Sequence, residues 1–412
     1  MEQQKAGLYL GIDISDKYTM LSIYQQHMTE PQTISTIMGS ESYQIPMVLA
    51  KKKGVGQWFF GHDAKMRIKA GEALGVDNLL TKAKAKEEIF LEHEKYDAAD
   101  LLTIYLKRVF SLAGSVHATM PLARMTICVD RVSVSYMELF SAVMVKLDFE
   151  PEKLLLVDRR ESFYYYALSQ QPETFLHDVV LFDYTESDMM SCCLHRNLHT
   201  TPQVITLEQK NNGKLLDQKD EQFKNIAEQI MAGQVVSSVY LIGDGFDGDW
   251  MKTSLQYLCH TRKVFLGKNL YSKGACYAGF IKDEKRDWPF VYIGDNELKL
   301  NLYLKVLIRN EMQFFTLITA GESWFDAVGE CEVILDGTPE IEVWIQRPES
   351  REAHVELLEL TDMVERERRT TRLRITAVPE SDCKVKITIR DLGFGEIAPS
   401  SNRTWEHTIC LE

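Results

Sequence analysis

Two segments of this sequence place an aspartate between two apolar runs, where a carboxylate could take part in chemistry. The first is LYLGIDISDKYTMLSIY (residues 8–24), with Asp13 at its first turn, and the second is DVVLFDYTESDMMSCCLHRN (178–197), with Asp183. The apolar runs predict a strand, a turn and a second strand in each segment. Proteins use such carboxylates to hold hydrated Mg²⁺ and to orient an attacking water. Aspartate is also favoured in turns for local reasons, so both interpretations stay open.

A second candidate for chemistry is the group Cys192, Cys193 and His195, which could be part of a metal site. The segment alternates like a strand and lacks the second pair of ligands that a tetrahedral site needs. The eight cysteines of the chain include no CxxC spacing and are too sparse for a disulfide framework. We therefore predict no metal site and no disulfide scaffold.

Length and charge limit the class of protein. A chain of 412 residues is too long for one compact core, so two or three domains are expected. The net charge of −13 argues against a nucleic-acid or anionic-membrane partner. The first residues, MEQQKAG, lack the apolar region of a signal peptide, and no 18-residue apolar stretch follows. We expect a cytoplasmic protein.

The first two thirds of the chain alternate predicted strands and helices. A helix is expected at 96–113, with Asp97 as its N-cap and Gly114 as its stop. Further strands are predicted at 47–50, 125–129, 154–158 and 238–245, and further helices at 135–149, 161–170, 222–233, 250–260 and 273–282. Because the strand–Asp–turn–strand pattern occurs twice, we predict a duplicated α/β unit with parallel strands covered by helices.

The remainder of the chain reads almost entirely as strands. They are expected at 302–308, 314–320, 330–335, 340–346, 354–360, 372–378, 384–391 and 405–411. Period-2 alternation is clear in EIEVWI (340–345) and KVKITI (384–389), so each strand has one buried face and one wet face. Eight short strands predict an antiparallel sandwich of ordinary domain size.

The order of these motifs resembles the heat-shock seventy chaperones. LGIDISDKY, GVGQWFFGHDAK, LLLVDRRESFYYYAL, LFDYTESDMM and VYLIGDGFDGDW follow the order of the family's ATPase motifs, and the region from EIEVWIQ onwards follows its peptide-binding sandwich. The resemblance implies an actin-like, duplicated ribonuclease-H-like ATPase fold at 1–284, a linker at 285–292 and an all-β antiparallel sandwich at 293–412. It places the family's catalytic positions at Asp13, Lys65, Glu161 and Asp183, and its nucleotide-binding positions at Ser15, Lys17, Thr185, Gly243 and Gly245.

The phosphate-binding turns depart from the family pattern. Ser15-Asp16-Lys17 replaces Gly-Thr-Thr, Thr185-Glu186-Ser187 replaces three glycines, and Asp244 replaces a glycine. Backbone approach to phosphate favours glycine. Two like charges about 4 Å apart repel by roughly 4 kcal/mol at an effective dielectric of 20. The carboxylates of Asp16, Glu186 and Asp244 therefore predict weakened nucleotide binding.

Two further features bear on the nucleotide site. Only 60 residues separate Asp183 from Gly243, where the family carries an additional subdomain over the adenine. The aromatic run at 163–166 stands where the family has small residues. These rings either fill the nucleotide space or pack against a neighbouring helix.

In the sandwich, any peptide groove is expected to be lined by Phe314, Phe315, Leu317 and Trp324, although these residues are equally typical of sandwich core. The sequence stops at Glu412, where the chaperones continue into a helical lid, so rapid exchange of peptide is expected.

We thus expect a non-hydrolysing scaffold that needs no cofactor and binds a protein or peptide client. The alternatives are a weak ATPase that uses ATP and Mg²⁺ with Asp13, Lys65, Glu161 and Asp183, and an actin-like assembly protein.

Overall fold

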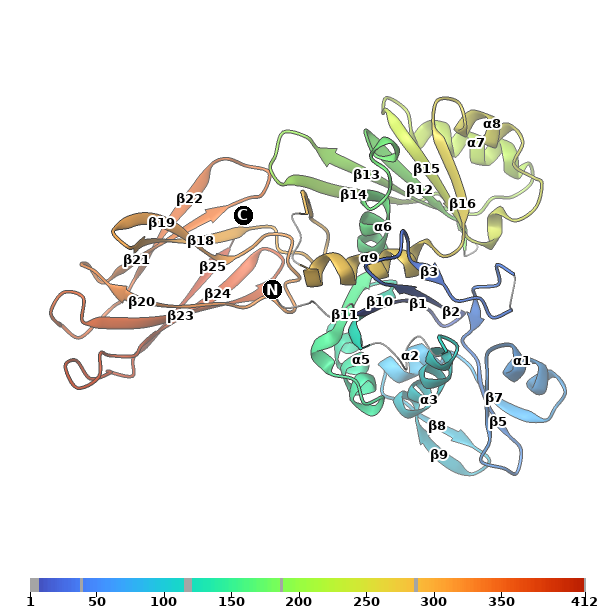
Figure 1. Ribbon diagram of the computed structural model, residues 1–412, viewed down its shortest axis with the longest axis horizontal. Coiled ribbons are helices and arrows are strands. Elements are labelled where there is room, and N and C mark those ends of the chain that lie inside the picture. The colour runs from blue at the N-terminus through green and yellow to red at the C-terminus, as the bar shows by residue number, and fades with distance from the viewer. Residues whose placement is uncertain (1–6, 38–39, 115–120, 186–187, 285–287, 411–412) are drawn as a thin grey trace. The chain divides into compact units, whose positions relative to one another are not determined.

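The computed structural model describes residues 7–37, 40–114, 121–185, 188–284 and 288–410 (Figure 1). The chain forms two compact units. The first contains residues up to His195 and Glu208–Trp288, and the second contains Arg196–Leu207 and Pro289–Glu412. Part of the predicted linker, residues 285–287, lies outside the described residues. The remainder of that segment includes the short strand β17 (Phe290–Tyr292).

The first unit is a mixed α/β structure with two sheets of corresponding strand order. In one, the order is β11 (Leu154–Asp158), β10 (Leu122–Val129), β1 (Leu8–Ile14), β2 (Tyr18–Tyr24) and β3 (Gln32–Thr33). In the other, it is β16 (Lys263–Gly267), β15 (Val236–Ile242), β12 (Asp178–Asp183), β13 (Met190–Asn197) and β14 (Gln203–Asn211). In both sheets the central strand pairs antiparallel with the next strand in the chain and parallel with a later one. The predicted repetition of the strand–turn–strand unit is therefore present in the sheets.

Helices and smaller strands complete the first unit. The helices are α1 (Gly61–Lys69), α2 (Leu79–Lys84), α3 (Ala98–Ser111), α5 (Val134–Lys146), α6 (Arg159–Leu168), α7 (Lys219–Ile230), α8 (Thr253–Leu258) and α9 (Leu270–Glu284). The smaller strands are β4 (Ile45–Pro46), β5 (Leu49–Lys52), β6 (Trp58–Phe60), β7 (Ala73–Val76), β8 (Glu88–Leu91) and β9 (Glu94–Asp97). Asp97 caps α3 as expected, because its carboxylate accepts hydrogen bonds from the N–H groups of Ala99 and Asp100.

Helix α6 begins two residues earlier than the sequence predicts. The carboxylate of Asp158 accepts a hydrogen bond from the Glu161 N–H at 2.8 Å and so caps the helix. Arg159 therefore stands at the first helical position. Its side chain faces the interior, where only 21% of it is exposed.

Two glycines allow α9 to approach its neighbours closely. A Cβ on Gly11 of β1 would lie 2.1 Å from the Ser272 carbonyl oxygen of α9. A Cβ on Gly274 of α9 would lie 2.1 Å from the Ser162 carbonyl oxygen of α6. Both distances are far below van der Waals contact, so any side chain would separate these elements. The close fit of α9 against β1 and α6 fixes where their side chains meet.

The second unit contains two antiparallel sheets of four strands. Their orders are β19 (Glu311–Ile318), β18 (Asn301–Ile308), β21 (Glu340–Gln346), β22 (Ala353–Glu359), and β20 (Gly329–Leu335), β23 (Thr371–Ser381), β24 (Lys384–Asp391), β25 (Thr404–Cys410). Their alternate side chains share one apolar core, with Leu304 and Val343 from the first sheet and Ile375 and Ile387 from the second. All eight predicted strands are confirmed, with bounds shifted by a few residues.

No helix among the described residues is both long enough and apolar enough to cross a membrane.

The second unit contains a buried ion pair between Arg366 and Asp391. Arg366 donates to both carboxylate oxygens of Asp391, at 2.8 and 2.7 Å, and the two side chains are only 8% and 3% exposed. The N–H groups of Gly393 and Ser401 also donate to this carboxylate. Burial would raise the pKa of Asp391, but Arg366 and these hydrogen bonds hold it well below its usual value.

We predict that Asp391→Asn lowers the free energy of unfolding of the second unit by about 3–5 kcal/mol, because Arg366 is left buried without its partner. Because folding depresses the pKa of Asp391, its contribution is present near neutral pH and is lost as the pH falls below about 4. Hydrogen exchange of the β24 amides measures both effects. As a control, Asp336→Asn removes an exposed partner of Arg368 and Arg369 and should change little. Equal effects of the two substitutions would contradict the assignment.

Candidate functional site

The structure brings together the two aspartates that the sequence singled out. Asp13 lies near the end of β1 and Asp183 at the end of β12, the central strands of the two sheets of the first unit. They are close enough for Asp183 to raise the pKa of Asp13. Arg159 in the first turn of α6 lies beside Asp13, and Tyr271 at the start of α9 contacts Asp183. The candidate site is therefore at the ends of the two central strands.

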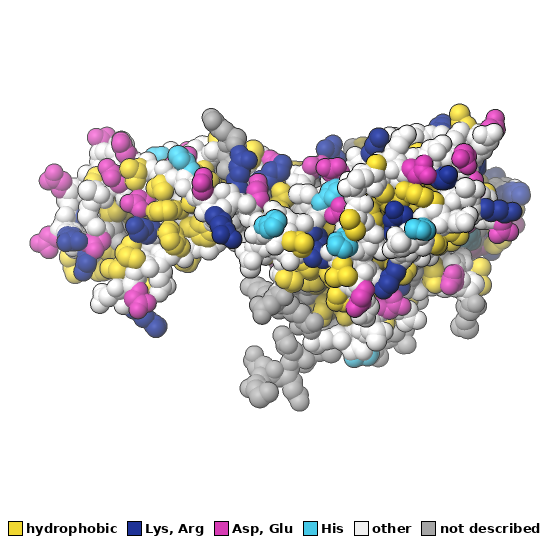
Figure 2. Space-filling model, turned by 90° about the horizontal axis from the view of Figure 1, so that it is seen from above, with side chains coloured by type: hydrophobic (Ala, Val, Ile, Leu, Met, Phe, Trp, Pro, Cys, Tyr) yellow, Lys and Arg dark blue, Asp and Glu magenta, His cyan; other side chains and the backbone are white. Residues whose placement is uncertain are grey.

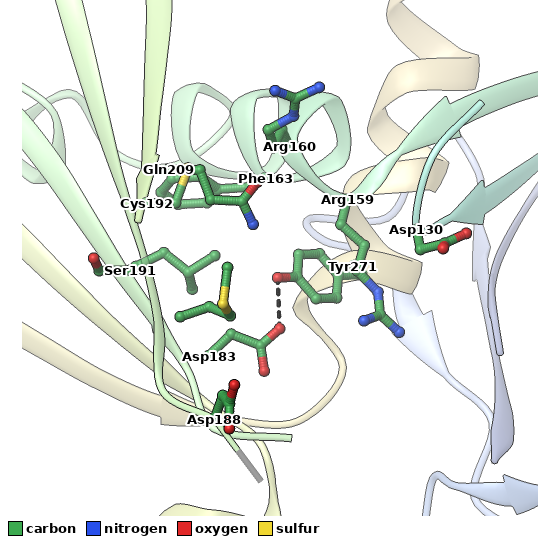
Figure 3. Close-up of a pocket in the computed structure, with 12 residues that line it drawn as sticks. Asp130, Arg159, Arg160, Phe163, Asp183, Asp188, Ser191, Cys192, Gln209 and Tyr271 are labelled. Carbon is green, nitrogen blue, oxygen red and sulfur yellow. Dashed lines mark hydrogen bonds between the residues drawn. The ribbon is translucent and has the colours of Figure 1, made fainter. Parts of the chain in front are cut away.

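Arg159 supplies a positive charge at this meeting point. Its Nε lies 3.6 Å from Oδ1 of Asp13, and its Nη2 donates to the Tyr18 hydroxyl at 3.4 Å. Its guanidinium carbon is 5.3 Å from the centre of the Tyr271 ring, and the Tyr271 hydroxyl donates to Asp183 at 2.8 Å. Figure 3 shows Arg159 beside Tyr271, with the dashed hydrogen bond to Asp183. The chain's own cation thus lies beside one aspartate and is linked through a tyrosine to the other.

Burial makes these charges depend on one another. Asp13 is fully buried, and neither of its carboxylate oxygens has a hydrogen bond of ordinary geometry within the described residues. Burial raises the pKa of Asp13; Arg159 opposes the rise and Asp183 adds to it. Burial alone would lower the pKa of Arg159, but Asp13 and the neighbouring tyrosines raise it well above its usual value. Arg159 is the positive charge that opposes the effect of burial on the pKa of Asp13.

The other two predicted catalytic residues lie elsewhere. Lys65 is exposed on α1 and does not line the cavity described below. Glu161, in the first turn of α6, is 4% exposed and forms an ion pair with Lys282 of α9 at 2.7 Å. Burial raises the pKa of Glu161, and Lys282 opposes the rise. Of the four predicted catalytic residues, the structure brings together Asp13 and Asp183.

Each of the predicted phosphate-binding turns is stabilised by hydrogen bonds between its own residues. The Ser15 hydroxyl accepts from the N–H groups of Lys17 and Tyr18, and Lys17 is exposed. Thr185 donates both its N–H and its hydroxyl to the carboxylate of Asp183, at 2.9 and 2.5 Å. These bonds are typical of turns that form without a ligand.

The two predicted glycines face protein. Gly243 has φ of +104°, and a Cβ there would lie 2.4 Å from the backbone nitrogen of Thr185. A Cβ on Gly245 would lie 2.3 Å from the ring of Tyr184. Both glycines are therefore explained by contact with the turn that follows β12.

The expected repulsion from acidic turn residues requires a correction. The carboxylate of Asp16 accepts hydrogen bonds from the N–H groups of Leu80 and Thr81, so it caps α2. Asp244 forms an ion pair with Lys268 at 2.8 Å. Glu186 lies outside the described residues. The charges of Asp16 and Asp244 are thus compensated within the chain, so neither carboxylate is expected to repel a phosphate group.

The four rings of the aromatic run in α6 have different surroundings. Phe163 lines the cavity. Tyr165 stacks on Trp288 at 6.2 Å, the Trp288 indole donates to the Tyr164 hydroxyl at 2.6 Å, and Tyr166 contacts Tyr240. One ring therefore reaches the cavity, and the other three pack against neighbouring elements.

A small cavity of about 150 Å³ lies next to Arg159. It is lined by Asp130, Arg159, Arg160, Phe163, Leu181, Asp183, Asp188, Met190, Ser191, Cys192, Gln209 and Tyr271. Sites for drug-sized ligands have volumes of roughly 300–1,000 Å³. The volume of the cavity is about half the lower bound of this range.

The side chains of Cys192, Cys193 and His195 do not come together at one site. Cys192 lines the cavity, Cys193 belongs to the apolar core of the second sheet, and His195 pairs with Asp178 at 3.0 Å. Among the described residues, no three His, Cys, Asp or Glu side chains come together as a metal site would require.

The predicted peptide-binding residues of the second unit have mixed surroundings. Leu317 is buried in the shared core, and Trp324 packs against that core. Phe314 and Phe315 are 56% and 37% exposed. Leu317 and Trp324 therefore belong to the packing of the core. Phe314 and Phe315 are exposed and could contact a partner.

Comparison with known proteins divides the chain at nearly the same place as the structure. A family model described as a family of unknown function (DUF5716) C-terminal matches residues 30–295. The chain belongs to the DUF5716 family. A second model, a domain of unknown function (DUF8552), matches residues 297–411 of this DUF5716 protein. No curated protein matches the sequence. Neither matching family is the heat-shock seventy family, so that resemblance remains a prediction.

Sequence reasoning missed Arg159 and Tyr271. Arg159 follows directly after the strand LLLVD, within the segment LLLVDRRESFYYYAL, and a basic residue there was a visible signal. Its meaning depended on the helix beginning at Arg159 instead of Glu161. Tyr271 gave no comparable signal, because its role depends on the close contacts of α9.

We predict that Arg159→Gln lowers the free energy of unfolding by about 3–5 kcal/mol, because Asp13 is left buried without a cation. A raised pKa in the folded state means that ionised Asp13 costs stability as the pH rises. The loss relative to wild type should therefore be larger at pH 8 than at pH 5. Urea unfolding at the two pH values measures it.

The matched control is Arg160→Gln, since Asp158, the partner of Arg160, keeps its hydrogen bond from the Glu161 N–H. Its effect should be smaller and independent of pH. Adding Asp13→Asn to Arg159→Gln should recover part of the loss. A pH-independent loss in Arg159→Gln would show that Arg159 acts only through packing contacts.

We further predict that Asp16→Ala destabilises the first unit by about 1 kcal/mol, as loss of a helix cap does. Because the carboxylate already serves α2, its removal should not create nucleotide binding. Thermal unfolding with and without Mg-ATP tests both points. Binding of Mg-ATP by Asp16→Ala alone would restore the interpretation based on repulsion.

Proposed function

We propose that this DUF5716 protein is a non-hydrolysing, actin-like scaffold related to the heat-shock seventy chaperones, which binds a protein or peptide partner through its C-terminal β-sandwich. The corresponding strand orders of the two sheets support a duplicated ribonuclease-H-like frame. The eight-stranded second unit, with one core between two sheets, supports the sandwich.

The observation that carries the proposal is the position of Arg159. An ATPase of this kind places Mg²⁺ and phosphates between its two central strands, and carboxylates there meet the metal through water. In this chain a guanidinium lies 3.6 Å from Asp13, and Tyr271 donates to Asp183. A cation already held by the chain favours the empty state over binding of a metal-nucleotide complex, because ligand entry would require Arg159 to leave a buried carboxylate.

The remaining observations support a protein that no longer cycles between ATP binding and hydrolysis. The turns that would hold phosphates form hydrogen bonds between their own residues. Gly243 and Gly245 lie in close contact with Tyr184 and Thr185. The interval between β12 and β15 contains the β13–β14 hairpin and α7. Partner binding by the second unit is supported by the exposed Phe314 and Phe315.

We predict that wild-type protein shows no binding of Mg-ATP or Mg-ADP in isothermal titration and no rise in melting temperature. A ligand present at 100 times its Kd would stabilise the folded state by about 2.7 kcal/mol, which thermal unfolding detects easily. Micromolar binding of Mg-ATP would overturn the proposal.

The ATPase alternative has its own test. Steady release of phosphate that is lost in Lys65→Ala, and retained in the control Lys69→Ala on the same helix, would establish an enzyme. Absence of phosphate release from wild-type protein is the result that we expect.

A further inference from the structure

One face of the second unit carries a set of exposed and half-buried apolar side chains. It is the outward face of the sheet β19-β18-β21-β22, which we call the apolar face. Its members are Tyr303, Leu307, Met312, Phe314, Trp344, Val355 and Leu357, of which Leu357 and Met312 are 57% and 58% exposed. Figure 2 shows hydrophobic side chains gathered on the second unit, at the left of the view, with acidic side chains toward the left edge.

The strand register makes this face continuous. Tyr303 of β18 is opposite Trp344 of β21, and Trp344 is opposite Val355 of β22. The Phe314 ring lies 5.1 Å from that of Trp344, and Lys305 places its ammonium 5.9 Å from the Trp344 ring. A row of apolar side chains therefore crosses all four strands, with Lys305 among them.

The other sheet of the same unit has a different outer face. There the charged side chains are paired across strands: Arg374 with Glu332 at 2.7 Å, and Lys386 with Glu406 at 2.9 Å. Lys384 also pairs with Glu380. This second face carries cross-strand ion pairs, with exposed apolar residues such as Ile334 and Val378 between them. The two faces are thus built for different surroundings.

One end of the apolar face is acidic and uncompensated. Glu340 of β21 is directly opposite Glu359 of β22, and Glu342 is opposite Leu357. Within the part of the chain that the structure describes, none of these three glutamates takes part in an ion pair. Like charges directly opposite each other on neighbouring strands are destabilising. A cation from outside the chain would relieve this repulsion.

From these observations we propose that the apolar face binds a basic amphipathic helix of a partner protein. The inference rests on the proposed scaffold function and names the surface and the partner chemistry. A sheet face is covered by a helix or by another sheet. Four strands spaced about 4.8 Å apart span roughly 14–19 Å, which accommodates one helix of about 10 Å diameter. The apolar stripe of the helix would lie on Phe314, Trp344 and Leu357, and its basic side chains would meet Glu340, Glu342 and Glu359.

Charge argues against a second copy of this chain as the occupant. On each copy, the apolar face has one lysine, Lys305, and three glutamates. Two such faces packed together would leave carboxylates without partners in a partly dehydrated interface, which is costly. A basic helix satisfies both the apolar stripe and the acidic end.

The test uses the full chain and a defined probe. The probe is a helical peptide of about 18 residues made of leucine and lysine, with leucines at i, i+3, i+4 and i+7 so that they form one stripe. A control peptide has the same composition in an order that disperses the leucines. Fluorescence anisotropy should show binding of the striped peptide at least about tenfold tighter than the control.

Two matched pairs of variants locate the site. Leu357→Ser should weaken binding at least about tenfold, whereas Ile334→Ser, which is similarly exposed on the other sheet, should not. Glu340→Gln should weaken binding and raise the melting temperature, because it removes the repulsion with Glu359. Glu332→Gln breaks an ion pair on the other sheet, so it should leave binding unchanged and not raise the melting temperature.

The outcomes separate this inference from the proposed function. Equal binding of both peptides, or equal effects of Leu357→Ser and Ile334→Ser, would overturn the basic-helix proposal while leaving the nucleotide tests untouched. Concentration-dependent dimerisation abolished by Leu357→Ser would overturn it in favour of self-association. Micromolar binding of Mg-ATP would overturn the non-hydrolysing function, whatever the peptide result.

Discussion

The first unit depends on the balance of charge around one buried carboxylate. Asp13 is fully buried near the end of a central strand, and a carboxylate in that position is costly unless a cation is close. Arg159 supplies that cation from the first turn of α6, with its Nε 3.6 Å from Asp13. Tyr271 connects the same region to Asp183 by a hydrogen bond of 2.8 Å. The two central strands are thereby linked through side chains of the chain itself.

This arrangement needs helices that approach one another more closely than ordinary side chains allow. Gly11 lets α9 lie directly on β1, and Gly274 lets it lie directly on α6. A side chain at either glycine would clash with the backbone of the neighbouring element. The arrangement of charges in the site therefore depends on the close backbone contacts of α9. The same constraint leaves a cavity of only about 150 Å³ beside the arginine.

The outer faces of the two sheets in the second unit carry different interactions. Its core is shared by both sheets, and its charged side chains are paired on the outer face of one sheet but not at the acidic end of the other. Alternation along each strand places residues on a face, but the register between strands decides which residues are neighbours. Glu340 opposite Glu359, and Tyr303 opposite Trp344, are consequences of that register. A surface with both an apolar row and unpaired carboxylates is therefore a property of the assembled sheet.

The sequence by itself determined the elements whose causes are local. The apolar runs around Asp13 and Asp183 predicted strand–turn–strand units, and Asp97 predicted the start of α3. Short strand-like segments, two of them with clear alternation, predicted the eight strands of the second unit. Only the tertiary structure decided which charges meet. Asp16 and Asp244 looked like repulsive groups in sequence, yet one caps α2 and the other pairs with Lys268. Arg159 lies beside Asp13, although 146 positions separate them in the chain, because the parallel pairing of β1, β10 and β11 brings the start of α6 to the end of β1. Local patterns fix backbone conformation, whereas the partners of a buried charge depend on contacts between segments that are distant in sequence.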